Sequence, residues 1–523
     1  MSSRRLGFSL PKGLEKLYNS RKFDSFSVHF SVHFADQIGG CFFNEGSLRM
    51  HASADSQARS HTDPLSLAAE QLRADPRVQQ AEALLLAALA DAQSQIVGPK
   101  PAKPELKEHY KSLLERLALA RGGATYFPYL GSGIGRGPWV ELADGSVKLD
   151  FIVGIGVHGM GHSHPQLLSS SLHAALEDTV MQGNLQQHPP SVDVCERLIR
   201  MARKSGAEIA HCLLSTSGAM ANENALKIAF HNRAPADRVL ALDNCFAGRS
   251  IAMAQLTDRP QYRTGVPTAL AVDYIPAEDP EHSVESQDRA LAALDKLLKR
   301  YPGKHAALWL ELVSGEGGYY PGSQAFFTKL IERAKQDNVL VIFDEVQTFS
   351  RLSEPFAFQH FQLDKYADIV SIGKITQLCA TLYRGDLKPK GPLLSQTFTA
   401  ASSSIAAAQV VLDQLEKSNC FGPNGENMRR HQVFAQKLQE LCKRYPGKIS
   451  GPHGLGMMVA FTPGDGSNEV ANKMVYAMYE AGLMGFVAGS NPTRIRFLPP
   501  PFITTDADIE AACKILDEVL ASF

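Results

Sequence analysis

A lysine stands where a buried strand should end. The mostly apolar segment "DIVSIG" (368–373) runs directly into Lys374. A buried ammonium group is costly unless it has a partner or takes part in a reaction. Partial desolvation lowers the pKa of such a lysine and makes it a nucleophile. The alternative is an exposed lysine on a loop, and this segment alone does not exclude it.

A carboxylate ends another apolar run. Five apolar residues precede Asp344 and Glu345 in "VLVIFDEV" (339–346). Such a carboxylate can be a metal ligand, a general base, a partner for a ring nitrogen, or only a helix cap or salt-bridge partner. Nucleotide hydrolases carry similar strand ends, but the chain has no GxxxxGK[ST] loop, which excludes that class.

A turn of small residues follows a third run. The segment "AHCLLST" (210–216) leads into Ser217, Gly218 and Ala219, where a helical stretch begins. Small residues at a helix N-terminus let backbone N–H groups approach an anion, and the helix dipole attracts it. The alternative is a plain strand-to-helix turn with a Ser or Thr cap.

These three features together meet the needs of one cofactor. Pyridoxal 5′-phosphate requires a lysine that forms a Schiff base, a carboxylate that keeps the pyridinium nitrogen protonated, and a cradle for the phosphate. Lys374, Asp344 and the turn at 217–219 are the residue types that would supply them. The sequence therefore predicts a site for this cofactor where several strands end.

Alternating elements should bring these residues together. Strand-like and helical runs alternate after residue 165, which predicts a mainly parallel sheet covered on both faces. Ligands of such sheets lie at the carboxyl ends of the strands. The predicted strands are 210–216, 238–243, 306–313, 339–346 and 368–373, and the predicted helices between them are 219–231, 286–300 and 323–336.

The chain divides into four predicted parts. Residues 1–104 form an N-terminal extension with helices at about 65–97, interrupted at Asp75-Pro76. Residues 105–165, with a hairpin around Asp144-Gly145, form the N-terminal part of a small domain. Residues 166–399 form the large cofactor-binding domain. Residues 400–523 form a smaller α+β domain with a strand in "GLGMMVAFT" and a closing helix.

The amino-acid composition limits the classes of partner and the cellular compartment that we expect. The formal net charge of -1 gives no global attraction to nucleic acid or to anionic membranes. No apolar run reaches the roughly 18 residues that a membrane helix needs. The eight cysteines form no CxxC pair, so we expect reduced thiols, which suit a cytoplasmic protein.

The N-terminus leaves three interpretations open. Residues 1–22 carry six basic residues against one acidic residue, together with serines, which resembles a transit segment. A disordered tail is the interpretation that we favour. Translation that begins at Met50 is the third.

Ordered motifs carry a family resemblance. From about residue 125 to 520 the chain resembles class III aminotransferases, which are pyridoxal phosphate enzymes of fold type I. "GKITQLC" and "ENALK" are most similar to lysine 6-aminotransferases, followed by 4-aminobutyrate aminotransferases. The matching segments are, in order, "LDFIVGIGVHGMGHSHPQL", "STSGAMANENALK", "FAGR", "ELVSGEGG", "FDEVQT", "GK", "QTFTAASSSIAAAQVVLDQL" and "RIRFLPP".

The resemblance implies a fold and roles around the cofactor ring. The fold would be α/β, with a mainly parallel seven-stranded sheet in the large domain and a smaller α+β domain. Lys374 would form the Schiff base and shuttle the proton, and Asp344 would pair with the pyridinium nitrogen. Gln347 would lie near the phenolic oxygen, and Phe246 would stack on the ring.

The phosphate site would involve two subunits. Ser217, Gly218 and Ala219 would hold the phosphate from one subunit. Thr397 would reach in from the partner subunit. The resemblance thus implies a homodimer with shared active sites.

Three charged residues would bind the substrates, which the resemblance implies are an amino acid and a 2-oxo acid. Arg249 would hold the far carboxylate of an ω-amino donor such as lysine, ornithine, acetylornithine or 4-aminobutyrate. Arg496 would pair with Glu316 and be released to bind 2-oxoglutarate, because arginine grips carboxylates with two parallel hydrogen bonds.

Several positions depart from the family pattern and bear on the substrate rather than on the cofactor. Leu312 and Ser314 replace the usual Pro and Gln, and Met220 replaces an acid. Phe349 stands where a glycine is usual. Another reaction on the same fold, such as that of an aminomutase or a decarboxylase, is an alternative, although the retained Glu316 and Arg496 favour an aminotransferase, because two half-reactions need two ways to bind a carboxylate. A non-catalytic homologue that acts through its N-terminal extension is a second alternative.

Overall fold

A seven-stranded sheet carries the residues of the predicted site. In the computed structural model its order is β5-β13-β12-β11-β8-β6-β7. β13 runs antiparallel to both neighbours and the other pairs are parallel. The mainly parallel seven-stranded sheet is therefore confirmed. Its strands are β5 (Ile209–Ser215), β6 (Arg238–Leu242), β7 (Ala271–Ile275), β8 (His305–Leu310), β11 (Leu340–Asp344), β12 (Ile369–Ile372) and β13 (Cys379–Arg384).

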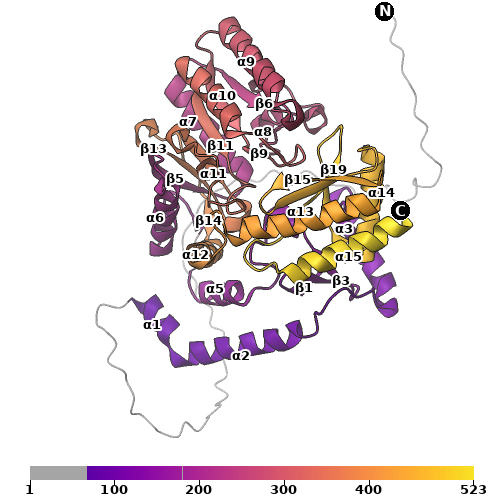
Figure 1. Cartoon of the computed structure of the whole chain (residues 1–523). Coiled ribbons are helices and arrows are strands. Elements are labelled where there is room, and N and C mark those ends of the chain that lie inside the picture. Colours follow the sequence, from indigo (N-terminus) through magenta and orange to yellow (C-terminus); the bar gives the residue numbers. More distant parts are fainter. Residues whose placement is uncertain (1–66, 179–180) are drawn as a thin grey trace, which may run out of the picture. The chain divides into compact units, whose positions relative to one another are not determined.

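The structure describes residues 67–178 and 181–523, which belong to one compact unit (Figure 1). The three interpretations of the N-terminus, including a start at Met50, lie outside the described residues. Within the described ranges, no helix combines the length and the apolarity that crossing a membrane requires.

Helices cover both faces of the large sheet. Phe343 of β11 packs in the same cluster as Leu330 of α10. Its neighbour Ile342 points the other way and packs with Leu226 of α7. Because both faces are buried, β11 is continuously apolar up to Asp344 rather than alternating. The helices around this sheet are α6 (Pro189–Arg203), α7 (Gly218–Arg233), α8 (Ile251–Leu256), α9 (Ser283–Arg300), α10 (Gln324–Gln336) and α11 (Ala357–His360).

Most of the predicted elements are present, with three corrections. β7 and β13 complete the sheet but were not among the predicted strands. The predicted strand 306–313 ends early, at Leu310, because Glu311 turns its carboxylate onto two backbone N–H groups. After that break, Val313–Ser314 form the short strand β9, which pairs with β10 (Tyr320–Pro321).

The third correction lies in the C-terminal sheet, whose order is β15-β16-β19-β18. The predicted strand in "GLGMMVAFT" is the end of one strand and the start of the next. Leu455 pairs with Met458 across a tight turn at Gly456, which has φ +59. The strands are β15 (Ile449–Leu455), β16 (Met458–Pro463), β18 (Phe486–Ala488) and β19 (Arg494–Phe497), and the accompanying helices are α12 (Ser402–Lys417), α13 (Glu426–Arg444), α14 (Asn468–Ala481) and α15 (Asp506–Ser522).

A third sheet joins residues 131–150 to the C-terminal part of the chain. Its order is β1-β2-β3-β17, and Leu149 of β3 pairs with Leu483 of β17. The hairpin predicted around Asp144-Gly145 is β2–β3. The domain boundaries after residues 104, 165 and 399 stay predictions. The elements are β1 (Gly131–Arg136), β2 (Trp139–Leu142), β3 (Val147–Asp150), β17 (Leu483–Met484), α3 (Lys107–Arg121), α4 (Val153–Gly156) and α5 (Pro165–Ala175).

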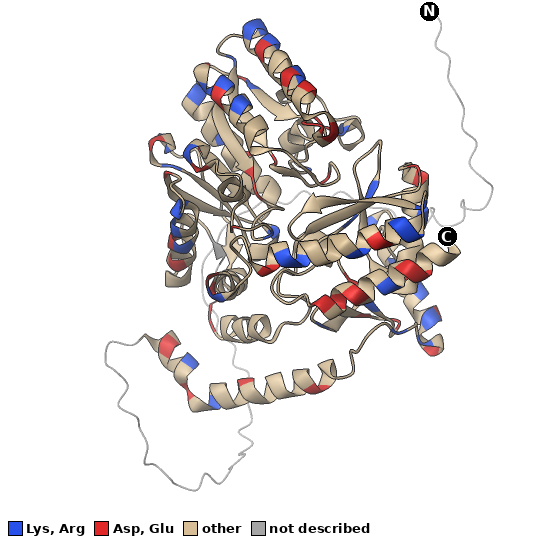
Figure 2. Ribbon diagram, in the orientation of Figure 1, with Lys and Arg blue, Asp and Glu red and all other residues tan. Residues whose placement is uncertain are grey.

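The helices α1 (Ala68–Ala74) and α2 (Pro76–Gln93) separate at Asp75-Pro76, as predicted. Asp75 caps α2 by accepting a hydrogen bond from the backbone N–H of Arg77, and proline fits the first helical position. α2 carries few charges along its length, whereas α9 carries both signs (Figure 2). Gln93 fixes the end of α2 by donating to the carbonyls of Gly135 (2.7 Å) and Ser163 (2.9 Å).

Candidate active site

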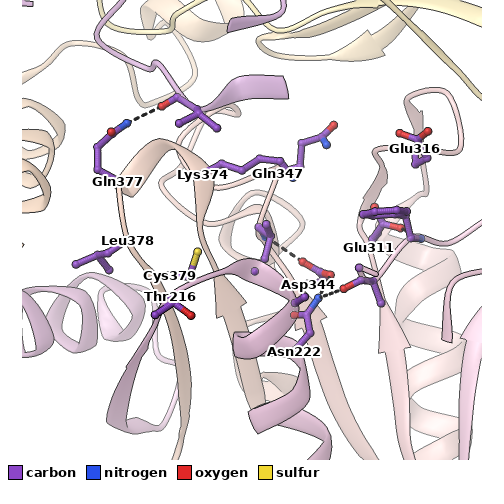
Figure 3. Close-up of a pocket in the computed structure, with 17 residues that line it drawn as sticks. Thr216, Asn222, Glu311, Glu316, Asp344, Gln347, Lys374, Gln377, Leu378 and Cys379 are labelled. Atoms are coloured by element: carbon purple, nitrogen blue, oxygen red, sulfur yellow. Dashed lines mark hydrogen bonds between the residues drawn. The ribbon is translucent and has the colours of Figure 1, made fainter. Parts of the chain in front are cut away.

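A cavity of about 370 Å³ lies at the carboxyl ends of β11 and β12 (Figure 3). This is the position at which open α/β sheets bind their ligands. Most of the predicted site residues meet here. Those that line the cavity are Gly218, Ala219, Phe246, Glu316, Asp344, Gln347 and Lys374.

Lys374 lies just beyond the end of β12 and lines the cavity. Its backbone has φ +55, in the left-handed region that residues with a Cβ rarely adopt. Such strain persists only where the surrounding structure enforces it, and it is frequent at active sites. Burial lowers the pKa of the Lys374 ammonium, while the nearby Asp344 carboxylate acts in the opposite direction. Burial thus favours the neutral amine, which is the nucleophilic form of the lysine.

The turn after Lys374 packs tightly on Gly159. A Cβ at this glycine would lie 2.2 Å from Cγ1 of Ile375, which is fully packed. We expect Gly159→Ala to lower the free energy of unfolding by about 1–3 kcal/mol, as overpacking does. Turnover should fall as well, because Ile375 directly follows Lys374. Denaturant unfolding and steady-state rates measure both effects.

Gly123→Ala is the matched control, because a Cβ there meets no atom within 4 Å. Its stability and turnover should match those of the unsubstituted protein. Equal behaviour of the Gly159 and Gly123 variants would contradict the packing argument.

Asp344 ends β11 as a nearly buried carboxylate. It accepts hydrogen bonds from Nδ2 of Asn222 (2.8 Å) and from the backbone N–H of Val346 (3.0 Å). Burial raises the pKa of Asp344 to about 6, although these donors and Lys374 favour the charged form. A protonated ring nitrogen beside the carboxylate would stabilise its charged form further.

Asn222 is a site residue that sequence reasoning missed. It also donates to the carbonyl of Ala247 (2.8 Å). It thereby ties together the helix that follows the phosphate turn, the end of β11 and the segment that carries Phe246. A signal existed in the sequence, because Asn222 lies four positions after Gly218 and so on the same face of the helix.

The predicted phosphate turn opens α7. The Ser217 hydroxyl accepts a hydrogen bond from the backbone N–H of Met220 (3.2 Å), so Ser217 is the N-cap. Gly218 and Ala219 line the cavity, together with Thr216, which was not predicted. A Cβ at Gly218 would lie 2.8 Å from Val346, so a larger residue would crowd the cradle.

Glu311 is the second residue that was missed. One oxygen accepts from the backbone N–H of Phe246 (2.7 Å) and the other from that of Gly315 (3.0 Å). Burial, with the nearby Asp344 charge, raises the pKa of Glu311 to about 8. Glu311 therefore holds the segment with Phe246 against the segment with Glu316.

Glu316 and Arg496 form an ion pair at the cavity. Nη2 of Arg496 lies 2.6 Å from Oε2 of Glu316, and Nη1 donates to the carbonyl of Gly315 (2.8 Å). The Arg496 side chain has no exposed surface, whereas that of Glu316 is 22% exposed. In this pair the arginine is enclosed by protein, whereas the glutamate reaches solvent.

Four predicted residues are not among those that line this cavity, namely Ser217, Arg249, Thr397 and Arg496. Arg249 is exposed, and its guanidinium carbon lies 3.3 Å from the ring centroid of Tyr262. Thr397 is exposed too, shortly before β14 (Ala400–Ala401), which pairs with β4 (Met181–Gln182). Its predicted role concerns a partner subunit and stays a prediction.

The residues around the cavity fit pyridoxal phosphate. They include an amine, a buried carboxylate, an aromatic ring and a small-residue helix N-terminus. Among the residues that line the cavity, two buried oxygens, Oδ1 of Asn222 and Oε1 of Gln347, have no hydrogen-bond partner. Buried polar atoms of that kind call for a polar ligand.

Comparison with protein families decides the assignment. The family described as aminotransferase class-III matches residues 130–520. The chain belongs to this family. Class III aminotransferases depend on pyridoxal phosphate, so this protein is a pyridoxal phosphate-dependent aminotransferase. The cofactor, the fold and the enzyme class predicted from the motifs are confirmed.

Two similar proteins support the family assignment. An acetylornithine aminotransferase of Corynebacterium efficiens is 30% identical over 398 residues, which cover 74% of this chain and 91% of that protein. An acetylornithine aminotransferase of Methanocaldococcus jannaschii is 26% identical over 405 residues, covering 74% of this chain and 92% of that protein.

Solved structures share the fold of this class III aminotransferase. Lysine aminotransferase from M. tuberculosis gives a TM-score of 0.70 at 24% identity, covering 78% of this chain and 99% of that chain. Ornithine aminotransferase from Toxoplasma gondii gives a TM-score of 0.67 at 21% identity, covering 80% and 99%. The match to the family begins at residue 130, so α1, α2 and α3 precede it.

Proposed function

We propose that this aminotransferase moves an amino group from an ω-amino acid to 2-oxoglutarate in two half-reactions. The first would leave the donor as an aldehyde acid, and a cofactor held by Lys374, Asp344 and the turn at 217–219 would retain the amino group for the second. The second passes that group to 2-oxoglutarate and releases glutamate. The similar proteins named for acetylornithine, lysine and ornithine support a donor whose reacting amine is remote from a carboxylate.

One observation carries the proposal, namely the pairing of the buried Arg496 with the part-exposed Glu316. A buried arginine is strongly destabilising without a counter-charge. Glu316 can move toward solvent, and a substrate carboxylate can then take its place on Arg496. A pocket with this exchange accepts a dicarboxylate in one half-reaction and a monocarboxylate ω-amino donor in the other.

The remaining residues have distinct tasks in this proposal. Pyridoxal phosphate, when bound, draws off the electrons that are left when the substrate C–H bond breaks. Nζ of Lys374 takes the proton from the substrate carbon that bears the amino group. The Asp344 carboxylate keeps the ring nitrogen protonated. The backbone N–H groups at Gly218 and Ala219 bind the phosphate at the positive end of α7.

Further roles belong to the same proposal. Phe246 would stack on the ring of the bound cofactor, Gln347 would lie near its phenolic oxygen, and Ser217, the N-cap of α7, would help to hold its phosphate. Thr397 of one subunit reaches the phosphate of the other, in a homodimer with shared sites. The cytoplasmic location predicted from the cysteine pattern is likewise part of this proposal.

A spectrum of the purified holoenzyme tests the function. We expect the absorbance band of the bound cofactor to fall when lysine, ornithine, N-acetylornithine or 4-aminobutyrate is added alone. Addition of 2-oxoglutarate should then restore the band. A cofactor band that none of these amino acids changes would overturn the proposal and favour an aminomutase or a decarboxylase.

Arg249 gives the proposal a second test. Arg249→Ala should raise KM for the ω-amino donor by about tenfold or more, because a charge-assisted contact is lost. KM for 2-oxoglutarate should change much less, since Arg496 binds that substrate. Steady-state kinetics with each substrate varied in turn measure the two effects.

Arg300→Ala is the matched control for this variant. Arg300 is another exposed arginine beside a ring, that of Tyr301, at the end of α9. Its replacement should leave both KM values unchanged. Equal effects of Arg249→Ala on donor and acceptor would remove the donor argument.

A further inference from the structure

The guanidinium of Arg249 is held by an aromatic ring rather than by an acid. Its central carbon lies 3.3 Å from the ring centroid of Tyr262. No described residue makes a hydrogen bond or an ion pair with the Arg249 side chain. A guanidinium that stacks through its face keeps its in-plane N–H groups free. These are the donors that a carboxylate binds in a two-pronged manner.

Tyr262 is itself fixed in place. It belongs to the short 3-10 helix η2 (Pro260–Arg263), and its ring meets Phe246 edge-on, with centroids 6.3 Å apart and planes at 88°. The next residue, Arg263, donates to the carbonyl of Thr257 (2.7 Å). The ring is therefore placed from two sides, by the cavity residue Phe246 and by the anchored turn.

The backbone that carries Arg249 is anchored as well. The N–H of Ala247 donates to Oγ1 of Thr257 (2.9 Å). Ser250 caps α8 and donates to Glu223 (2.5 Å). Since both flanks are fixed, the freedom that remains at this position is that of the long Arg249 side chain. Ordering such a side chain costs conformational entropy when a ligand binds.

We propose that Tyr262 is a positioning residue that preorganises Arg249 for the distal carboxylate of the amino donor. The inference rests on the proposed function, because it assumes that Arg249 binds the donor. It adds a specificity determinant from a segment that no motif singled out. The stacking reduces the number of arrangements that the guanidinium samples and leaves its N–H edge open to the donor.

Two substitutions separate the ring from the hydroxyl. Tyr262→Leu removes the π-face and should raise KM for the donor about 3- to 20-fold, with kcat nearly unchanged. Tyr262→Phe keeps the face and should stay within about twofold of the unsubstituted enzyme. The donor is whichever of lysine, ornithine, N-acetylornithine and 4-aminobutyrate reacts fastest in the spectroscopic assay.

Three readouts exclude a merely structural effect. The half-reaction with 2-oxoglutarate, followed by the return of the cofactor band, should keep its rate in Tyr262→Leu. Thermal unfolding should stay close to that of Tyr262→Phe. In an Arg249→Ala background, Tyr262→Leu should add nothing to the KM for the donor, because the residue through which it acts is gone.

The outcomes distinguish this inference from the proposed function. If Arg249→Ala raises the donor KM and Tyr262→Leu does not, the role of Tyr262 is overturned while the donor role of Arg249 stands. A lower donor KM in Tyr262→Leu would mean that the ring holds Arg249 away from the substrate, which also overturns it. If Arg249→Ala itself has no effect, both the donor role and this inference fail.

Discussion

Lys374→Ala is expected to abolish turnover, with a loss of at least about 10³-fold, because the variant lacks the amine that moves the substrate proton. The substitution leaves the backbone strain at this position unchanged, because alanine, like lysine, carries a Cβ at the left-handed φ of +55. The steady-state rate with the best donor measures the loss. Appreciable activity in the variant would refute the assignment of the site.

A second readout does not depend on activity. Borohydride reduction followed by peptide mass spectrometry should find the cofactor attached to the Lys374 peptide of the unsubstituted protein and no attachment in the variant. Lys388→Ala, at an exposed lysine on the chain beyond β13, is the control. It should keep both activity and attachment. Attachment at another lysine would contradict the predicted role.

Asp344→Asn should lower kcat by at least about 100-fold, the scale of a lost electrostatic contact in an active site. Asparagine has nearly the same shape and can still accept the hydrogen bond from Val346. It carries no charge, however, and so cannot hold a ring nitrogen protonated. Turnover with saturating cofactor measures the effect. A variant with near-normal kcat would show that the carboxylate is not needed.

Glu345→Gln is the matched control, because the neighbouring carboxylate faces away from the cavity. Glu345 accepts hydrogen bonds from the backbone N–H groups of Ala357 and Phe358, both at 2.9 Å. We expect that variant to lose about 1–3 kcal/mol in the free energy of unfolding and to keep most of its activity. An activity loss as large as that of Asp344→Asn would contradict the separation of roles.

The pH dependence of stability adds a check on Asp344. Its folded pKa of about 6 lies above the ordinary value, so the folded state binds more protons than the unfolded state between about pH 4 and pH 6. This group therefore makes the cofactor-free protein less stable as pH rises through that window. Asp344→Asn lacks the effect. The unfolding free energy of Asp344→Asn minus that of the unsubstituted protein should therefore rise between about pH 4 and pH 6, because only the unsubstituted protein loses this stability.

The sequence was sufficient to predict the residues that end buried strands. Lys374 and Asp344 stand out because each is a charged residue directly after an apolar run. Such a residue marks the end of a buried strand, where ligands of an α/β sheet bind. The sequence did not predict Glu311, because its two hydrogen bonds join segments that meet only after folding. It was also insufficient for β13, whose residues Cys379–Arg384 include a mix of polar and apolar side chains. The side chain of Arg249 shows the same limit, since nothing local indicates that it lies on Tyr262.

The antiparallel strand β13 has a consequence for how the enzyme assembles. Ser215, just before the phosphate turn, pairs with Cys379, and Thr381 pairs with Ser371 on the other side. The strand that leads into the phosphate cradle is thus joined to the sheet by residues made much later in synthesis. Non-local pairings of this kind form slowly. During translation β5 therefore cannot take its place in the sheet until the ribosome has passed β13, so we expect cofactor capture to be a late event that reports a nearly finished chain.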